Sequence, residues 1–343
     1  MNTDTPSQTC VVSIIIKALN EEKRIATAIE SALQAVDSVG GEVILADSYS
    51  TDRTIEIAER YPIKIVQLAN PNERCCGIGP QLGYQFARGK FVYILDGDMQ
   101  MLPDFLPKAL EFMRKTPQAG GVGGQVIEMN TQSLEFLARV ERAAHHMQPG
   151  LVDRLDMGGL YRKSAIDSVG YFSNRNLHSY EELDLAVRLR SKNWKLYRIE
   201  SEAVRHWGHD APPYQLLTKR WKTRYINGLG EVLRAAIGKP HLKLLLKDIK
   251  ELRIYLATIV WWLVLIVTLF LPLNWGSTLA LFSLIAIAPI GLMSIRKKSF
   301  SKALYSVISW NFNAAGLIRG LFSSQATLAK IDSTFSDITH DRP

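Results

Sequence analysis

Two aspartates separated by one glycine are the sharpest chemical feature of this sequence. Asp96, Gly97 and Asp98 follow Lys90–Leu95, an apolar run with the composition of a buried strand. Carboxylates held at a strand end can bind Mg²⁺ or Mn²⁺ through oxygen and leave coordination positions open for phosphates. Such a metal would stabilise the charge that builds on a departing diphosphate. Asp and Gly are also common loop residues, so a purely structural turn is the alternative.

A further carboxylate follows another short apolar run. Asp47 comes directly after the predicted strand Glu42–Ala46 and well before the helix predicted from Thr54. Helix capping explains Ser50 and Asp52 in the same stretch, but it does not explain Asp47. A carboxylate at a strand end can accept a hydrogen bond from a base N–H or from a ribose hydroxyl.

Candidate acids and a candidate metal ligand also occur in the second half of the chain. Glu181, Glu182 and Asp184 begin an amphipathic helix expected over 181–192. Acids at a helix start are favoured by the helix dipole, which is the alternative to a role as general base. His206 offers a neutral imidazole to a metal, although a structural or surface histidine is also compatible with the sequence.

The elements that must position these groups alternate between strand and helix. Short β-branched runs predict strands at 11–16, 42–46, 63–68 and 90–95, and helical periodicity predicts helices between them, with Asn20 as the N-cap of the first. This alternation predicts an α/β domain with a mainly parallel sheet. Ligands of such sheets bind beyond the carboxyl ends of the strands, where Asp47, Asp96 and Asp98 are expected.

With these motifs in order, residues 11 to about 210 resemble a family 2 glycosyltransferase with the GT-A fold, a Rossmann-like α/β fold. The resemblance is carried by a strand that ends in Asn-Glu, an Asp-x-x-Ser-x-Asp-x-Thr stretch, a glycine-spaced helix and strand, and Asp-x-Asp. The matching residues are Asn20, Glu21, Asp47, Ser50, Asp52, Thr54, Gly77, Gly83, Ala87, Gly89, Asp96 and Asp98.

The resemblance implies a role for each candidate residue. On the donor side, Glu21 and Asp47 would hold the base and ribose, Arg74 would approach the diphosphate, and Asp96 would contact the ribose or sugar. Asp98 would bind the metal, with His206 as a further ligand. On the acceptor side, Glu182 would be the general base, and the residues around it would be Gly158, Gly159, Glu181 and Asp184, of which either acid could replace Glu182.

The implied activity is an inverting transfer from a UDP-, GDP- or dTDP-sugar, with Mg²⁺ or Mn²⁺ as cofactor. Ser48, Gln81 and Glu182 depart from residues common in the family, so a membrane adaptor that keeps the fold without catalysis is an alternative. A processive polysaccharide synthase is another. Arg220-Trp221 resembles part of a processive motif, but Gln215 lies too far upstream to complete it.

The distribution of apolar residues predicts a membrane anchor. No Asp, Glu, Lys or Arg occurs from Ile254 to Ile295. A single helix of that length would measure ~60 Å, about twice the hydrocarbon core, so we expect two spans at 254–273 and 277–295. A buried hairpin of a soluble protein is the alternative. The apolar stretch 303–322 carries two asparagines and an arginine, and it could be a third span, a re-entrant segment or an interfacial helix.

Charge places the ends of these spans. Lys and Arg precede the first span and follow the second, while the turn between them is uncharged, so we expect the catalytic domain and both ends on the cytoplasmic side. The polar start does not resemble a signal peptide. Much of the net charge of +8 lies near the membrane segment, which favours lipid over nucleic acid as the partner. A lipid or lipid-linked acceptor fits this placement.

The sequence therefore divides into five parts. We expect a polar tail at 1–10, the GT-A domain at 11–210, a basic juxtamembrane connector at 211–253, a membrane domain at 254–322 and a polar tail at 323–343. Three cysteines without metal-ligand spacing suit a reducing compartment. Taken together, these expectations describe a membrane-anchored enzyme of cell-envelope glycan or glycolipid synthesis.

Overall fold

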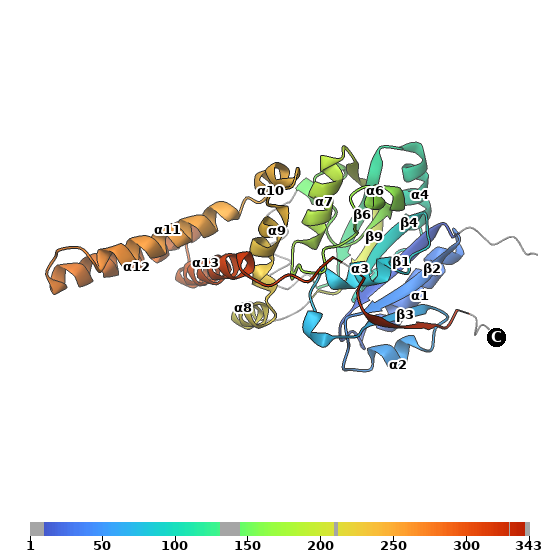
Figure 1. Ribbon diagram of the computed structural model, residues 1–343, viewed down its shortest axis with the longest axis horizontal. Coiled ribbons are helices and arrows are strands. Elements are labelled where there is room, and N and C mark those ends of the chain that lie inside the picture. Colours follow the sequence, from blue (N-terminus) through green and yellow to red (C-terminus); the bar gives the residue numbers. More distant parts are fainter. Residues whose placement is uncertain (1–9, 131–144, 209–211, 329, 340–343) are drawn as a thin grey trace, which may run out of the picture.

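The computed structural model describes residues 10–130, 145–208, 212–328 and 330–339. Its centre is one mixed sheet, whose first half is parallel and follows the strands predicted from the sequence (Figure 1). The strand order there is β3, β2, β1, β4, and every neighbouring pair is parallel. The bounds are β1 Val12–Ala18, β2 Gly41–Asp47, β3 Lys64–Leu68 and β4 Phe91–Asp96.

The second half of the sheet brings later parts of the chain beside β4. An antiparallel strand, β8, joins β4 to β6, and β9 then runs parallel to β6. Short strands β5 and β7 pair antiparallel with β9. The bounds are β5 Met99–Met101, β6 Ala119–Glu128, β7 Gly150–Val152, β8 Gly159–Arg162 and β9 Lys195–His206.

Both faces of the parallel strands are buried, which explains their continuous apolar runs. Ile14 and Ile16 point into one core cluster, with α1 and α4, and Ile15 points into another, with α3, α6 and α7. Alternate side chains of one strand therefore serve opposite helical layers. The helices are α1 Ile25–Asp37, α2 Thr54–Ala58, α3 Ile78–Tyr84, α4 Phe105–Lys115, α6 Lys163–Asp167 and α7 Glu181–Ser191, with single 3-10 turns at Pro71–Glu73 and His145–Met147.

The start of α1 differs from the expectation. Asn20 was predicted as its N-cap, but the capping residue is Arg24, and Asn20 has a left-handed backbone with φ 60°. The Asn20 Oδ1 instead accepts a hydrogen bond of 2.7 Å from the Thr51 amide. Asn adopts a left-handed backbone more readily than most residues. Its short side chain here accepts a hydrogen bond from the neighbouring loop and not from the start of the helix.

A layer of helices follows the sheet domain in the region predicted as a connector. α9 (Gly228–Ala236) packs against α13 (Phe300–Leu321) at glycines, because a Cβ at Gly230 would lie 2.1 Å from the Leu317 carbonyl. A third core cluster joins this layer to α7 through Leu183 and Val187. The remaining elements of the layer are α8 Pro213–Lys222, a 3-10 turn at Tyr225–Asn227, and α10 Leu242–Asp248.

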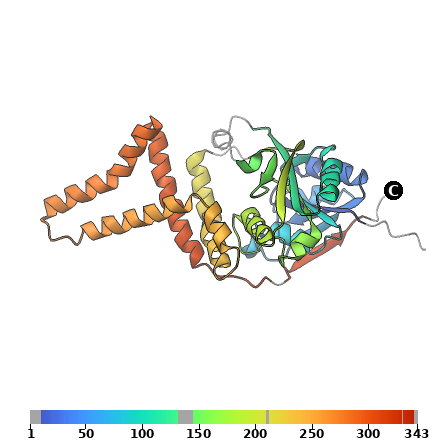
Figure 2. The ribbon, with the colours of Figure 1, turned by 90° about the horizontal axis from the view of Figure 1, so that it is seen from above.

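Two apolar helices project from this layer, away from the sheet (Figures 1 and 2). They are α11 (Leu252–Thr268) and α12 (Trp275–Lys297). About half of their large apolar side chains are exposed, and none is buried. Among the described helices, α12 is long and apolar enough to cross a membrane, and α10 with α11 would make a second such segment, bent by 82°. α13 does not meet the same criterion.

The segment after α13 returns to the sheet. Residues Ser333–Asp337 form β10, which pairs antiparallel with β3 at the edge of the sheet (Figure 1). Ile331 is completely buried in the core beside α3, and its backbone exchanges hydrogen bonds with the Gln85 side chain. The stretch expected as a polar tail thus contains an edge strand. Four of its five residues are polar, so the run shows no strand pattern in the sequence.

Candidate functional site

The strand ends bring the predicted donor-side acids to one edge of the sheet. Residue pairing between β1 and its neighbours sets Ala18 opposite Asp47 and Lys17 opposite Asp96. Glu21 follows three residues after β1. The predicted convergence at the carboxyl ends of the parallel strands is therefore what the topology produces.

Asp47 and Arg74 shape the loop that follows β2. The Asp47 carboxylate is completely buried and accepts hydrogen bonds from the Ser50 amide at 2.9 Å, the Ser50 hydroxyl at 2.5 Å and the Gln67 amide at 3.0 Å. The Arg74 guanidinium donates to the backbone carbonyls of Ser48 and Tyr49. Both side chains lie where the donor site is predicted, and both are occupied in holding residues 48–50.

Glu21 lies against the Asp-Gly-Asp turn. A Cβ at Gly97 would lie 2.8 Å from the Glu21 Cγ, so only glycine permits this close approach. Burial, followed by the carboxylates of Asp98 and Asp96, raises the pKa of Glu21 to about 7. Three acids therefore face one small volume, where a cation would relieve their mutual repulsion.

The imidazole of His206 lies between the carboxylates of Asp98 and Glu128. The Asp98 Oδ2 lies 3.5 Å from the His206 Nε2, and the His206 Nδ1 lies 2.8 Å from the Glu128 Oε1. Burial lowers the pKa of His206, but the two carboxylates outweigh it and raise the value to about 9. Without a metal, the imidazole is therefore protonated between two acids.

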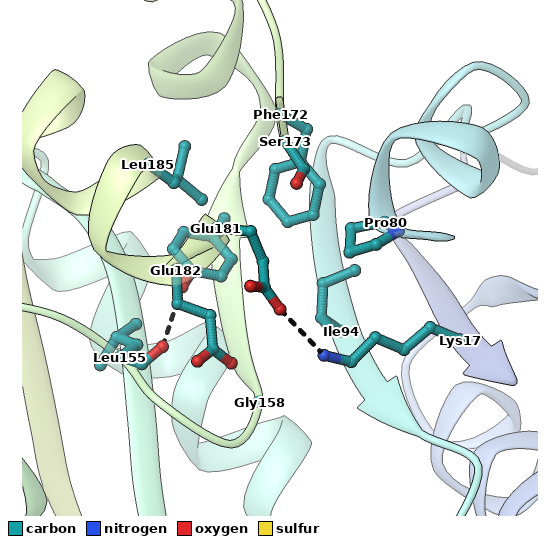
Figure 3. A pocket seen from close by; sticks show the side chains of 11 residues that line it. Lys17, Pro80, Ile94, Leu155, Gly158, Phe172, Ser173, Glu181, Glu182 and Leu185 are labelled. Carbon is teal, nitrogen blue, oxygen red and sulfur yellow. Dashed lines mark hydrogen bonds and ion pairs between the residues drawn. The ribbon is translucent and has the colours of Figure 1, made fainter. Parts of the chain in front are cut away.

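The predicted acceptor-side acids begin α7. Tyr180 precedes the helix with a left-handed backbone, φ 67°, and turns Glu181 and Glu182 toward the sheet edge. Figure 3 shows Glu181 directed at Lys17 and Glu182 directed at the loop that contains Gly158. The Glu182 Oε1 accepts a hydrogen bond of 3.1 Å from the Met157 amide. Gly158 has φ +94° and lines the same pocket as Glu181 and Glu182, and Gly159 follows it at the start of β8.

Lys17 joins the two sets of acids. Its Nζ lies 3.1 Å from the Asp96 Oδ1 on the donor side and 3.7 Å from the Glu181 Oε1 on the acceptor side. Burial opposes the charge of Lys17, but these two carboxylates prevail and hold its pKa well above the ordinary value. The ammonium is therefore a permanent cation at the centre of the site.

Two glutamates in this region have perturbed ionisation. Burial raises the pKa of Glu182 well above its ordinary value, and the nearby Asp156 carboxylate adds to the effect. Burial also raises the pKa of Glu181, although Lys17 acts against it. An acid whose pKa is moved toward neutrality is suited to exchange a proton with a substrate.

The described residues contain no group of three or more acidic, histidine or cysteine side chains arranged to hold a metal. Asp98 and His206 nevertheless offer one oxygen and one nitrogen that face each other. The Asp96 Oδ1 forms an ion pair with Lys17 but makes no hydrogen bond. Mg²⁺ typically takes one or two carboxylates and completes its shell with phosphates and water, so this sparse set fits a metal that arrives with a diphosphate.

Asp184 is not brought together with the other candidate acids. Its carboxylate is buried and lies 2.8 Å from the Arg188 Nε, one helical turn along α7. Arg188 in turn donates to the carbonyls of Tyr171 and Phe172. This pair anchors α7 to the preceding loop, and the pocket formed by Glu181 and Glu182 does not include it.

Three residues of the site carry information that the sequence reasoning missed or left unexplained. Lys17 is a charged residue inside a buried apolar strand, and a charge in such a run is a sequence signal for a buried ion pair or a functional role. Glu128 has no local signal, because its partner His206 becomes adjacent only through strand pairing. Gln81, a departure from the family pattern, accepts hydrogen bonds of 3.0 Å from the Phe172 and Ser173 amides, which gives it a structural role.

Comparison with known proteins identifies the domain. The sequence model of "Glycosyl transferase family 2" matches residues 13–170. The putative glycosyltransferase EpsE of Bacillus subtilis is 27% identical over 55% of this chain and 70% of its own length. The dolichol-phosphate mannosyltransferase of Pyrococcus furiosus is 27% identical, but this match spans only 30% of either chain.

Among solved structures, the mannosyltransferase PcManGT from Pyrobaculum calidifontis, in complex with GDP-Man and Mn²⁺, has a similar fold. The TM-score is 0.58 at 17% identity, and the match covers 92% of this chain and 88% of PcManGT. The prediction of a GT-A fold is confirmed. Residues 13–170 therefore form a glycosyltransferase family 2 domain.

Proposed function

We propose that this protein transfers a sugar, with inversion, from a nucleoside diphosphate sugar to a lipid or lipid-linked acceptor at the cytoplasmic face of a membrane. Mg²⁺ or Mn²⁺ would be the cofactor, held by Asp98 and His206. The observation that carries the proposal is the meeting of donor-side and acceptor-side acids around Lys17. A single displacement needs donor and acceptor groups within one small site.

The donor assignment follows from the edge of the sheet. Glu21 and Asp47 would hold the base and ribose, and Arg74 would approach the diphosphate. When bound, the metal supplies positive charge to the departing diphosphate. PcManGT is described in complex with GDP-Man and Mn²⁺, which supports a nucleotide sugar as the donor and a divalent metal as the cofactor.

Glu182 would be the general base for an acceptor hydroxyl, whereas a polyprenyl phosphate is already an anion and would need no base. One of the Glu182 oxygens already accepts the Met157 amide, which fixes the carboxylate and leaves the other oxygen for an acceptor hydroxyl. Its raised pKa makes it a stronger base once it is ionised. Glu181, which forms an ion pair with Lys17, would offset the charge of that ammonium. It is also the alternative to Glu182 as the base.

The placement of the apolar helices supports a lipid acceptor. The Tyr180 hydroxyl, at the start of α7, donates a hydrogen bond of 2.7 Å to Glu251, immediately before α11. Glu181 and Glu182 therefore directly follow a residue that contacts the base of the projecting helices. Several relatives are named for transfer to dolichol, undecaprenyl or dodecaprenyl phosphate. We propose 254–273 and 277–295 as spans, with 211–253 against the headgroups.

The first experiment is a donor screen on the detergent-solubilised protein. Thermal stabilisation would be measured with UDP, GDP, dTDP and their sugars, with Mn²⁺, Mg²⁺ or chelator. We expect one nucleotide to stabilise the protein only with metal, and Asp98→Ala to abolish the effect. Asp104→Ala, an exposed acid outside the site, is the matched control and should behave as wild type.

Each other outcome changes the proposal in a defined way. If none of the nucleotides or sugars stabilises a protein that is shown to be folded, the non-catalytic adaptor would be favoured. Stabilisation that is unaffected by chelator and by Asp98→Ala would remove the metal from the proposal. Once the donor is known, a polymeric product in a transfer assay would favour the processive synthase over the addition of a single sugar.

A further inference from the structure

The imidazole of His206 is fixed by a residue outside the proposed catalytic set. Strand pairing sets Glu128 of β6 opposite His206 of β9, and Met99 of β5 opposite the same histidine from the other side. Asp98 immediately precedes Met99. The register of three strands therefore aligns Asp98, His206 and Glu128 in one row.

The contacts within this row are asymmetric. Both Glu128 oxygens lie within hydrogen-bond distance of the His206 Nδ1, at 2.8 and 3.0 Å, whereas the Nε2 lies 3.5 Å from Asp98. An ionised carboxylate only accepts hydrogen bonds, so the Nδ1 must carry a proton whether or not the other nitrogen carries one. The nitrogen that a metal can bind is therefore the Nε2, which faces Asp98.

The surroundings leave the ring one orientation. The Glu128 side chain is 7% exposed and that of His206 11% exposed. The backbone at Gly208 closes over both, since a Cβ there would lie 3.1 Å from the His206 Cε1 and 3.2 Å from the Glu128 Oε1. The Gly208 amide also donates to Glu128, at 3.4 Å. A rotated imidazole would lose the Glu128 contact and approach this backbone.

We propose that Glu128 is a positioning residue for the divalent metal: it sets the tautomer and the ring orientation with which His206 binds the ion beside Asp98. This inference rests on the metal dependence proposed above. A carboxylate behind a metal-binding histidine fixes the ring and makes the free nitrogen a better ligand. Glu128 itself would not touch the metal or the substrate.

The test is the affinity for Mn²⁺, measured by calorimetry on the full-length protein with and without UDP or GDP. Glu128→Ala should weaken Mn²⁺ binding by roughly 10- to 100-fold, the usual effect of losing such a partner. Glu128→Gln keeps an acceptor oxygen but loses the charge, so its loss should be smaller. Because Glu128→Gln is the milder change, it still tests the proposal if Glu128→Ala does not fold.

The chain provides a matched control. His178 and Glu231 form the same kind of pair, with the Nδ1 and Oε1 2.9 Å apart and the glutamate 2% exposed, in the helical layer away from Asp98. Glu231→Ala should lower thermal stability in chelator as much as Glu128→Ala does, or more, because Glu231 is the more buried. Its Mn²⁺ affinity should remain within about twofold of wild type.

Two results would overturn the inference while leaving the proposed function in place. One is an Mn²⁺ affinity of Glu128→Ala and Glu128→Gln within twofold of wild type. The other is an equal loss in Glu128→Ala and Glu231→Ala, which would reflect general destabilisation. A wild-type protein that binds a nucleotide but no Mn²⁺ would instead overturn the metal role of Asp98 and His206, and the inference with it.

Discussion

Replacement of Lys17 by methionine tests whether its ammonium holds the acids of the site together. Methionine keeps much of the length of the lysine stem and removes the charge, leaving Asp96 and Glu181 without their shared cation. Removing one partner of a buried ion pair costs about 3–5 kcal/mol. Since the Lys17 side chain is 20% exposed and that of Asp96 28% exposed, we expect the low end, about 3 kcal/mol at neutral pH.

The loss should depend on pH, and the sign can be worked out. Lys17 lowers the pKa of Glu181, so its removal raises that pKa further above the value of the unfolded chain. A carboxyl group with a raised pKa stabilises the fold at low pH, and this stability is lost as the pH rises through the folded-state pKa. The variant should therefore be closest to wild type near pH 5 and furthest from it near pH 8, with a difference of up to ~1.4 kcal/mol per pH unit for each added proton.

The assay is thermal unfolding in detergent with chelator at pH 5, 6.5 and 8. A deficit of about 3 kcal/mol corresponds to a decrease in Tm of roughly 6–12 °C for a domain of this size. Lys64→Met is the matched control, because Lys64 is a buried lysine at the start of β3, paired at 2.5 Å with Glu42 of β2. Glu42 keeps hydrogen bonds from the Ser13 hydroxyl and the Arg88 amide, so the control should lose stability with a weaker dependence on pH. A Lys17→Met deficit that is constant from pH 5 to 8, or that follows the control, would refute the reasoning.

Two further predictions concern the returning C-terminal strand and the donor-side acids. Ile331→Ala should lower the unfolding free energy by about 2–5 kcal/mol because it leaves a cavity at a fully buried site, whereas the exposed Ser336→Ala should stay within about 0.5 kcal/mol; thermal unfolding of both variants checks this. Glu21, with its pKa raised to about 7 by burial and then by Asp98, should make the metal-free protein less stable as the pH rises from 5 to 8. Glu21→Gln should flatten this part of the Tm profile, and an unchanged slope would contradict the assignment.

The sheet could be predicted from the sequence because its signals are local. β1 to β4 are short β-branched runs bounded by polar residues, and each lies within about two residues of its predicted position. β10 could not be predicted in this way. Its residues, Ser333–Asp337, include one large apolar side chain, and the strand is stabilised by the exposed edge of β3 and by the burial of Ile331 beside it. Such a strand depends on tertiary contacts more than on its own pattern.

The candidate site likewise contains residues that could be placed from the sequence and contacts that could not. Asp47, Asp96 and Asp98 follow recognisable strands, so the rule for parallel sheets is enough to bring them together. The pairings that give them chemical character depend on register instead. Lys17 meets Asp96 because those two residues are opposite in β1 and β4, and Glu128 meets His206 because β6 and β9 are aligned through two irregularities in their pairing between Gly123 and Val126. A shift of one residue in β6 would turn Glu128 to the other face of the sheet, so the position of this bulged segment determines whether His206 has its carboxylate partner at all.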